Sequence, residues 1–198
     1  MKYNYILSFI ICLSFSLDSY SQNWDINGAE SINKWHIHGI SRCFSESTPV
    51  LSVGIPVGMG IYALIKKDEP LLKNAVYIGT SVIEAAGITL AAKHIFDRER
   101  PFVRYPDKIK PYGAPSSDSP SFPSGHSAAA FSLATSLSIT YPKWYVIVPS
   151  TIWATGVGIA RINQGVHYPS DVIVGAGIGV ACGFANVYVN RWLNKLLF

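Results

Sequence analysis

Residues 172–189 read VIVGAGIGVACGFANVYV, an apolar run with no charged side chain and no alternation of polar and apolar residues. Alternation with a period of two would indicate a half-buried strand, whereas an apolar run of this length indicates a helix. Its glycine and alanine residues allow close packing against a neighbouring helix. Similar apolar segments cover residues 49–65, 71–92, 127–141 and 144–160. The sequence therefore predicts an all-α fold, a bundle of five to six helices.

The lengths of these segments and the placement of charge bear on whether the bundle spans a membrane. The shorter segments would extend about 24 Å, less than the ~30 Å thickness of a hydrocarbon core. Lys66 and Lys67 would lie at an inner turn, on the same side as Arg191, as the positive-inside tendency expects. A transmembrane bundle is predicted, with the active site at its outer (periplasmic) ends, where residues 93–126 and 160–171 would meet. A soluble helical globule is the alternative.

The composition limits the class of protein and of partner. The chain has 198 residues, of which 49% are hydrophobic and 14% charged, against roughly 25% charged residues in an average soluble domain. Such a chain is not disordered, and its length fits one folded domain, here residues 22–198. The net charge of +4 is scattered without a long basic run, so no nucleic-acid partner is expected. An anionic substrate or an anionic membrane surface fits the charge equally well.

The N-terminus has the pattern of an export signal. Lys2 precedes an apolar stretch at residues 5–17, and Ser19-Tyr20-Ser21 provides small residues at the spacing of a cleavage site. We therefore expect residues 1–21 to be a signal peptide, with an uncleaved first membrane helix as the alternative. Either interpretation delivers Gln22 to the far side of the membrane.

Two cysteines, Cys43 and Cys182, follow the predicted signal. An oxidising compartment would allow them to pair. Cys182 lies in an apolar, glycine-rich run, which is more typical of a small buried hydrophobic residue.

The first candidate group for chemistry is a pair of cations. Lys93 and Arg100 are seven residues apart, or two helical turns, so they share one face if the helix continues between them. Two cations on one face suit a phosphate group. We expect Pro101 to stop the helix directly after Arg100, and Arg98 and Arg104 are competing cations. The alternative is two basic side chains that extend toward the membrane boundary.

The second group is Ser121-Phe-Pro-Ser-Gly-His-Ser127, which leads directly into an alanine-rich helix. Ser124 is a good N-cap, and Gly125 allows a ligand to approach the backbone. The free N–H groups of a first helical turn, together with the helix dipole, favour an anion. His126 could then donate a proton to a leaving oxygen. An ordinary capped helix start is the alternative.

The third group is Arg161-Ile-Asn-Gln-Gly-Val-His-Tyr-Pro-Ser-Asp171. Pro169 suits the first turn of a helix, which places His167 just before that helix and Asp171 one turn inside it. Asp171 could hold one imidazole nitrogen and leave the other free to attack. Arg161 would supply a guanidinium fork for phosphate oxygens. In the alternative, Asp171 only caps its own helix.

Together these spacings resemble the type 2 phosphatidic acid phosphatase superfamily, which includes bacterial class A acid phosphatases and vanadium haloperoxidases. The family pattern is Lys, six residues, Arg-Pro; then Pro-Ser-Gly-His; then Ser-Arg, five residues, His, three residues, Asp. One position departs from it, because Ala160 stands where the family has Ser. The resemblance thus leaves one hydroxyl contact to phosphate absent or supplied elsewhere. The matching residues are Lys93, Arg100-Pro101, Pro123-Ser124-Gly125-His126, Arg161, His167 and Asp171.

The resemblance implies a role for each matching residue. His167 would attack phosphorus and form a phosphohistidine, Asp171 would orient it, and His126 would protonate the leaving group. No metal and no cofactor are expected. His36 and His38 could form a metal site, but they fit better in an amphipathic interfacial segment with two tryptophans, Trp24 and Trp35. The residues expected to hold the phosphate oxygens are Lys93, Arg100, Ser124, Gly125 and Arg161.

The resemblance also implies a reaction, a membrane-bound, metal-independent hydrolysis of a lipid-linked phosphomonoester or pyrophosphate. We expect a bacterial inner-membrane protein with a periplasm-facing site. Candidate substrates are a phospholipid, a polyprenyl pyrophosphate and a lipid A phosphate. Residues 102–122, with Arg104, Lys108 and Lys110, are where head-group preference is expected. Alternatives are a soluble periplasmic non-specific acid phosphatase, a vanadate-dependent haloperoxidase, and an inactive phospholipid-binding or transport protein.

Overall fold

The computed structural model describes residues 24–113 and 119–197, with side chains up to Arg191, so the predicted signal segment at residues 1–21 lies outside the described residues. Regular structure in the described part is entirely helical. A short helix at residues 24–33 precedes the bundle. The predicted all-α bundle is confirmed, and its helices extend beyond the apolar runs that indicated them. The elements in chain order are α2 (His38–Lys66), α3 (Glu69–Phe96), α4 (Pro101–Arg104), α5 (Gly125–Thr140), α6 (Trp144–Asn163) and α7 (Pro169–Leu197).

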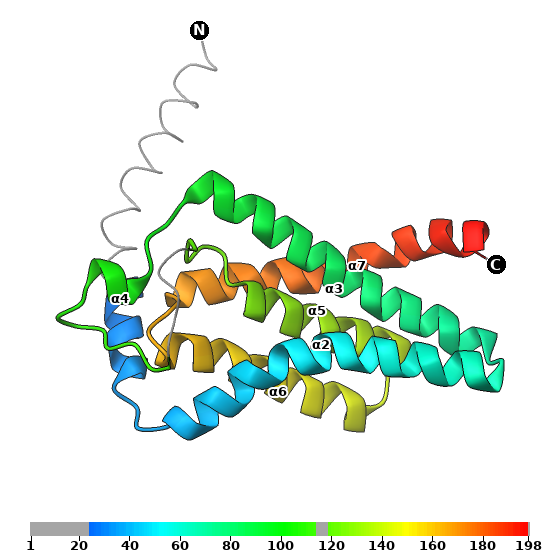
Figure 1. The fold of residues 1–198 in the computed structure, drawn as a ribbon, viewed down its shortest axis with the longest axis horizontal. Helices are drawn as coiled ribbons and strands as arrows, with labels where there is room; N and C mark the ends of the chain where they lie inside the picture. The colour runs from blue at the N-terminus through cyan, green and yellow to red at the C-terminus, as the bar shows by residue number, and fades with distance from the viewer. Residues whose placement is uncertain (1–23, 114–118, 198) are drawn as a thin grey trace, which may run out of the picture.

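Helix α5 is the centre of the bundle (Figure 1). It packs against α7, α6, α3 and α2. Its 16 residues extend about 24 Å, too short to cross a bilayer. Four described helices, α2, α3, α6 and α7, are long and apolar enough to cross a membrane. The segment at residues 127–141, which is too short to span a membrane, therefore forms α5, the helix that the longer helices surround.

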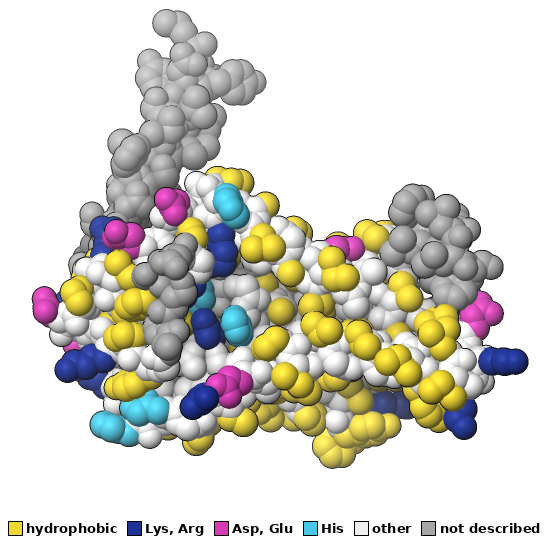
Figure 2. All heavy atoms as spheres, viewed as in Figure 1, with side chains coloured by type: hydrophobic (Ala, Val, Ile, Leu, Met, Phe, Trp, Pro, Cys, Tyr) yellow, Lys and Arg dark blue, Asp and Glu magenta, His cyan; other side chains and the backbone are white. Residues whose placement is uncertain are grey.

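The outward faces of the long helices are apolar. Along α2, for example, Val53, Val57 and Ile61 are each more than half exposed. Figure 2 shows hydrophobic side chains spread along the length of the bundle, with most charged side chains near its two ends. A surface of this kind suits lipid rather than water. The fold is that of a membrane protein, as the sequence predicts.

A row of glycines brings α7 directly onto α5. Gly175, Gly179 and Gly183 are spaced by four residues and so share one face of α7. A Cβ atom at Gly175 would overlap the Ser124 carbonyl oxygen, and one at Gly179 would overlap the Ala128 carbonyl oxygen. The two backbones are therefore in contact, as small residues allow in membrane helices. The first turns of α5 and α7 are held side by side as a result.

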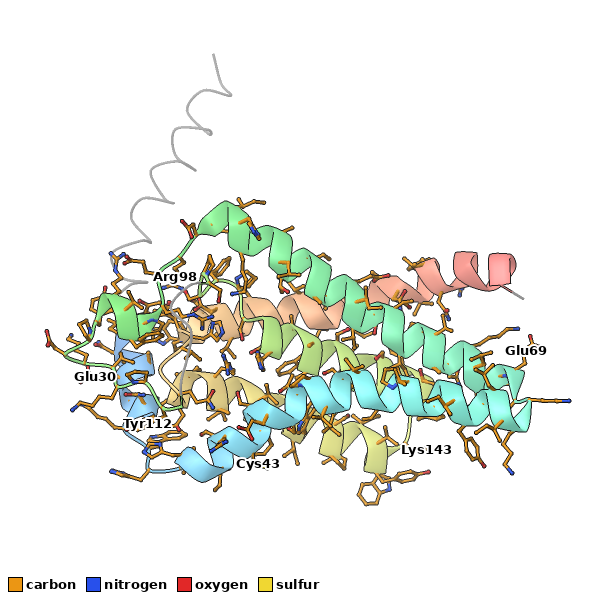
Figure 3. All side chains as sticks on the ribbon, viewed as in Figure 1. Glu30, Cys43, Glu69, Arg98, Tyr112 and Lys143 are labelled. Atoms are coloured by element: carbon orange, nitrogen blue, oxygen red, sulfur yellow. The ribbon has the colours of Figure 1, made fainter. Side chains whose placement is uncertain are left out.

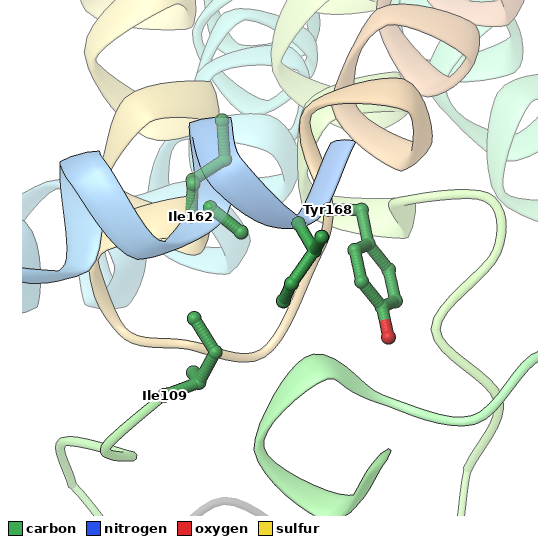
Figure 4. Packing of buried hydrophobic residues seen from close by; sticks show 5 residues of the cluster. Ile109, Ile162 and Tyr168 are labelled. Carbon is green, nitrogen blue, oxygen red and sulfur yellow. The ribbon is translucent and has the colours of Figure 1, made fainter. Parts of the chain in front are cut away.

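A small apolar core closes the end of the bundle at which α4 lies (Figure 4). Ile26 of the N-terminal helix packs in one cluster with Ile109, Ile162 and Tyr168. Polar ties support this core, because the Asn33 side chain donates to the carbonyl oxygens of Lys110 at 2.9 Å and Asn163 at 2.8 Å. The N-terminal helix is thus built into this end of the molecule.

The two cysteines do not pair. Cys43 on α2 is exposed, Cys182 on α7 is buried, and both are free. The expectation that Cys182 is a buried apolar residue is confirmed.

Candidate active site

The two segments that the sequence predicts to meet do lie at one end of the bundle. Lys93 comes from the last turn of α3, His126 from the first turn of α5 and Arg161 from the last turn of α6. The positive charges of Arg161, Arg100 and Lys93 all act on the His126 ring, as does His167. Basic and histidine side chains gather at this end in Figure 2.

Lys93 and Arg100 reach this place by a different route from the one predicted. Helix α3 ends at Phe96, and Asp97 adopts the left-handed conformation with φ of 39°, so no continuous helix carries both cations. Pro101 begins the short helix α4 instead of ending α3. The prediction that Lys93 and Arg100 share one helical face is therefore wrong, because the backbone turns at Asp97.

Hydrogen bonds to one loop bring these two cations together. Lys93 Nζ donates to the Pro120 carbonyl oxygen. Arg100 Nε donates to the Ser119 carbonyl oxygen at 2.9 Å, and its Nη2 donates to Ser119 Oγ at 2.7 Å. Arg100 Nη1 also donates to the Val166 carbonyl oxygen at 3.1 Å. Arg100 therefore links the loop before α5 to the turn that contains His167.

The predicted anion site has the geometry of a capped helix start. Ser124 is the N-cap of α5, and its hydroxyl accepts from the Ser127 N–H at 3.4 Å and from Ser127 Oγ at 3.0 Å. Gly125 and His126 form the first turn, where N–H groups lack helical partners and the positive end of the helix dipole lies. The prediction that Ser124 caps this helix is confirmed.

His167 and Asp171 lie within one turn of each other, both almost fully buried. His167 Nδ1 is 3.5 Å from Asp171 Oδ2, and the same oxygen accepts from the Tyr168 N–H at 2.9 Å. The turn before them depends on Gly165, whose φ of 74° favours glycine. Asp171 therefore faces the Nδ1 side of the imidazole, as the spacing predicts.

The electrostatic environment keeps both histidines uncharged at neutral pH. The pKa of His167 is lowered to about 4, mainly by burial and also by the charges of Arg161 and Arg100, while Asp171 opposes the shift. Burial and the charge of Arg161 lower the pKa of His126 to about 3. An uncharged imidazole has a free nitrogen lone pair, so His167 is in the form that a nucleophile needs.

The Arg161 guanidinium has hydrogen-bond partners at Nη1 and none at Nε among the described residues. Its Nη1 donates to Ser45 Oγ at 2.8 Å and to Gln164 Oε1 at 2.9 Å. Its Nε is buried and has no partner among the described residues. The preceding residue, Ala160, is 1% exposed. A hydroxyl does lie against Arg161, and it comes from Ser45 on α2 rather than from position 160.

A cavity of about 860 Å³ opens beside these residues. This volume is within the range of small-molecule sites and far exceeds what a phosphate group needs. His167 is 2% exposed and adjoins the cavity through its neighbour Val166. The lining residues are His38, Gly39, Arg42, Ser45, Glu46, Pro49, Tyr112, Gly113, His126, Arg161, Gln164 and Val166.

Head-group preference is expected in residues 102–122, and the structure places only part of that segment at the cavity. Tyr112 and Gly113 line it, whereas Arg104, Lys108 and Lys110 do not. That these three cations set head-group preference therefore stays a prediction.

Two residues at the site, the acidic Asp25 and the hydroxyl-bearing Ser45, belong to no motif in the sequence and were not predicted. Asp25, only 2% exposed, accepts from Arg98 Nη2 at 2.7 Å. Ser45 meets Arg161 from a helix more than a hundred residues away in sequence. Arg98, predicted only as a competing cation, forms an ion pair with Asp171 at 2.6 Å.

The described residues contain no group of three or more His, Cys, Asp or Glu side chains able to hold a metal ion. The ring of His38 instead stacks on Tyr112 with 3.5 Å between centroids. His36 lies 6.3 Å from His38 between ring centroids.

The chain is similar in sequence to one protein family and to several curated proteins. The sequence model described as PAP2 superfamily matches residues 74–195. A lipid A 1-phosphatase of Rhizobium etli is 32% identical over 153 residues, 69% of this chain and 62% of the relative. A lipid A 1-phosphatase of Porphyromonas gingivalis is 37% identical over 81 residues, 39% of this chain and 17% of the relative. The matches thus span less than two thirds of these two curated relatives.

A further curated relative is similar over more of its length. The undecaprenyl-diphosphatase BcrC of Bacillus subtilis is 28% identical over 155 residues, which cover 75% of this chain and 77% of the relative.

Two solved structures share the fold. LpxE from Aquifex aeolicus aligns with a TM-score of 0.64 and 26% identity over 83% of this chain and 95% of that one. A transmembrane PAP2 type phosphatidylglycerolphosphate phosphatase from Bacillus subtilis aligns with a TM-score of 0.63 and 24% identity, over 98% of this chain and 95% of that one. The latter comparison shows the fold alone.

Proposed function

Because the chain belongs to the PAP2 superfamily, we propose that it is a membrane-embedded phosphatase. It hydrolyses a lipid-linked phosphomonoester or pyrophosphate through a phosphohistidine on His167, without a metal. The observation that supports this most strongly is the buried pair of His167 Nδ1 and Asp171 Oδ2, 3.5 Å apart, placed beside three cations and a helix N-terminus.

In the first step, His167 Nε2 attacks phosphorus and the bond from phosphorus to the leaving oxygen breaks. Asp171 Oδ2 lies 3.5 Å from Nδ1, and its negative charge favours the tautomer with the proton on Nδ1, which leaves the Nε2 lone pair free. The equatorial oxygens are held by Lys93, Arg100 and Arg161, and by the first turn of α5 that Ser124 and Gly125 open. Fixed positive groups of this kind stabilise charge in the transition state of phosphoryl transfer.

His126 donates a proton to the leaving oxygen in that step. Its pKa is lowered to about 3, mainly by burial and by the charge of Arg161. A bound phosphate adds negative charge among the same cations, which raises the pKa of His126 and lets the ring take up a proton with the substrate. In the second step, neutral His126 removes a proton from water, which attacks phosphorus and releases inorganic phosphate from His167.

Lipid-linked substrates suit the placement of the site. The cavity lies at one end of a bundle whose sides are apolar, so a phosphorylated head group can enter it while the hydrocarbon chains stay in the membrane. The candidate substrates are a phospholipid, a polyprenyl pyrophosphate and a lipid A phosphate. The last two are supported by the activities for which the relatives from Rhizobium etli and Bacillus subtilis are named.

We also propose an orientation in the membrane and the bounds of the phosphatase domain. Lys66 and Lys67 lie at the α2–α3 turn, at the opposite end from the site, and the positive-inside tendency favours placing that end in the cytoplasm. The site then faces the periplasm from a bacterial inner membrane. Residues 22–198 form the single phosphatase domain, and residues 1–21 form the export signal.

Two other activities use the same residues. A soluble acid phosphatase is disfavoured by the exposed apolar faces of α2 and α3. A haloperoxidase would hold vanadate in the phosphate position. An assay of vanadate-dependent halide oxidation separates it, because the proposed phosphatase is expected to show none.

The substrate class is tested by phosphate release from the purified protein in detergent, without added metal. The panel contains phosphatidic acid, phosphatidylglycerol phosphate, a polyprenyl pyrophosphate, a lipid A phosphate and a soluble aryl phosphate. The proposal expects at least one lipid to be preferred over the soluble ester. Turnover of the soluble ester alone would identify a non-specific acid phosphatase, and no release from any substrate would identify a binding or transport protein.

A further inference from the structure

The N-terminal helix contributes a buried carboxylate, Asp25, to the first turn of α7, which also carries Asp171. Asp25 lies in this helix, is 2% exposed, and faces the first turn of α7. Its Oδ1 accepts from the Ser170 N–H at 2.8 Å, and its Oδ2 accepts from Ser170 Oγ. A buried carboxylate with this many partners has a fixed position, because its desolvation is compensated only in that geometry.

Arg98 joins this carboxylate to the partner of the nucleophile. Its Nη2 donates to Asp25 Oδ2 at 2.7 Å, and its Nη1 donates to Asp171 Oδ1 at 2.6 Å and to Ser170 Oγ at 2.8 Å. The guanidinium also lies over the Tyr168 ring at 3.8 Å from its centroid. Figure 3 labels Arg98 in the segment between α3 and α4, close to the start of α7.

The two oxygens of Asp171 therefore have separate tasks. Oδ1 is held by Arg98, while Oδ2 accepts from the Tyr168 N–H and faces His167 Nδ1. Because Arg98 holds Oδ1 and the Tyr168 N–H holds Oδ2, rotation of the carboxylate away from the imidazole is restricted. Partners of this kind, one shell behind the reacting group, orient it and tune its basicity.

We propose that Asp25 and Arg98 are positioning residues that fix Asp171 against His167, so that the N-terminal helix forms part of the active site. The inference rests on the proposed phosphohistidine reaction. Asp25 acts through Arg98, and neither residue touches the substrate. Asp25 balances the charge of Arg98, which would otherwise draw electron density from the carboxylate that supports the imidazole.

The test compares two variants with one control in the full chain in detergent, using the substrate that the wild type turns over best. Asp25→Asn removes a charge with little change of shape, and Arg98→Lys keeps the charge but loses the planar fork. Glu30→Gln is the control, because Glu30 lies on the same helix and its ion pair in the described part of the chain is with Lys34 at the surface. All rates are divided by the number of sites that incorporate phosphate, so partial unfolding does not lower them.

Both variants are expected to lower kcat about ten- to hundredfold, as loss of such supporting partners does elsewhere, with KM within about twofold of the wild type. The double variant is expected to be no slower than Arg98→Lys alone, since Asp25 acts through Arg98. The control is expected to match the wild type.

The pH profile gives a readout that a purely structural role would not move. The charged groups acting on His167 are Asp171, Arg161 and Arg100. Asp25→Asn leaves Arg98 less neutralised, which weakens the support of Asp171 for an imidazolium, so the acid limb of kcat/KM moves to lower pH. Arg98→Lys keeps the net charge, so its limb stays in place.

Several results would overturn the inference. One is a folded Arg98→Lys enzyme with wild-type kcat, which decides the matter even where Asp25→Asn does not accumulate. Another is an Asp25→Asn enzyme with an unmoved acid limb. Failure of the proposed reaction is recognised separately, because the wild type would then release no phosphate or His167→Ala would release as much as the wild type.

Discussion

Ser124 and Asp171 are joined by a backbone hydrogen bond, in which the Ser124 N–H donates to the Asp171 carbonyl oxygen at 3.0 Å. Ser124 opens the predicted phosphate site on α5, and Asp171 faces His167 from the first turn of α7. The bond forms because Gly175, one turn further along α7, has no side chain to separate the two helices. The residues proposed to hold phosphate and those proposed to attack it are thereby kept in register.

Gly175→Ala is expected to lower activity at least tenfold and to destabilise the fold by about 1–3 kcal/mol, as overpacking does. A Cβ at this position meets the Ser124 backbone, which cannot move without moving the phosphate site. Thermal unfolding in detergent and phosphate release measure the two effects. Gly177→Ala is the matched control, since nothing lies within 4 Å of its Cβ position, and equal behaviour of the two variants would contradict the packing argument.

Asp171→Asn is expected to lower kcat by about 10²- to 10⁴-fold while KM changes little. The amide can present a donor to the imidazole and favours the wrong tautomer, an effect of this size in histidine-dependent hydrolases. Steady-state kinetics of the purified variant measure it. Glu99→Gln serves as the control, because Glu99 is exposed and only 3.8 Å from the equally exposed Arg104. A loss below tenfold in Asp171→Asn would mean that Asp171 does not orient the nucleophile.

The pH dependence of kcat/KM is expected to have an acid limb with its midpoint near pH 4. Burial lowers the pKa of His167 to about 4, and only the uncharged ring can attack, so activity falls as pH decreases through that value. The limb reports the free enzyme. Ionisation of the substrate is separated by using two phosphate esters of different pKa. An enzyme-borne midpoint near the ordinary histidine value of about 6.5 would contradict the buried environment.

Arg42→Gln is expected to raise KM a few-fold for a lipid pyrophosphate and to leave the soluble aryl phosphate unchanged. Arg42 lines the cavity and is paired with Glu46 at 2.6 Å on the exposed side of α2, where solvent screens its charge and keeps the expected effect small. Kinetics with both substrates measure the difference. Lys34→Gln, a change of the same kind outside the cavity, should alter neither KM. Equal changes in KM for both substrates would remove Arg42 from head-group selection.

Local patterns in the sequence predict the parts of the site that are close together in the chain. Ser124 caps α5, and Asp171 lies one turn after His167, because a helix start fixes these relations within four residues. The apolar runs likewise predict the bundle. Their ends were less predictable, since the polar Asp97 takes the left-handed conformation that ends α3 where no glycine or proline marks a stop.

Contacts between distant segments could not be predicted in this way. Asp25 meets Ser170 across 145 residues, and Ser45 meets Arg161 across 116 residues. A single buried acid or hydroxyl has no periodicity, and only the packing of the N-terminal helix and of α2 decides what it touches. The charged residues Arg104 and Lys108 show the converse, because their charge indicates a role in head-group binding but they do not line the cavity.

The most direct test of the account is covalent trapping of the phosphoenzyme. Purified wild type is mixed with substrate labelled at the transferred phosphate and quenched in alkaline detergent, alongside His167→Ala, with no metal added. The account predicts label on the wild-type chain that survives alkali and is lost in acid, as a phosphohistidine behaves, and no label on His167→Ala. Phosphate release by the wild type with no trapped label, or equal label on both proteins, would contradict His167 as the nucleophile.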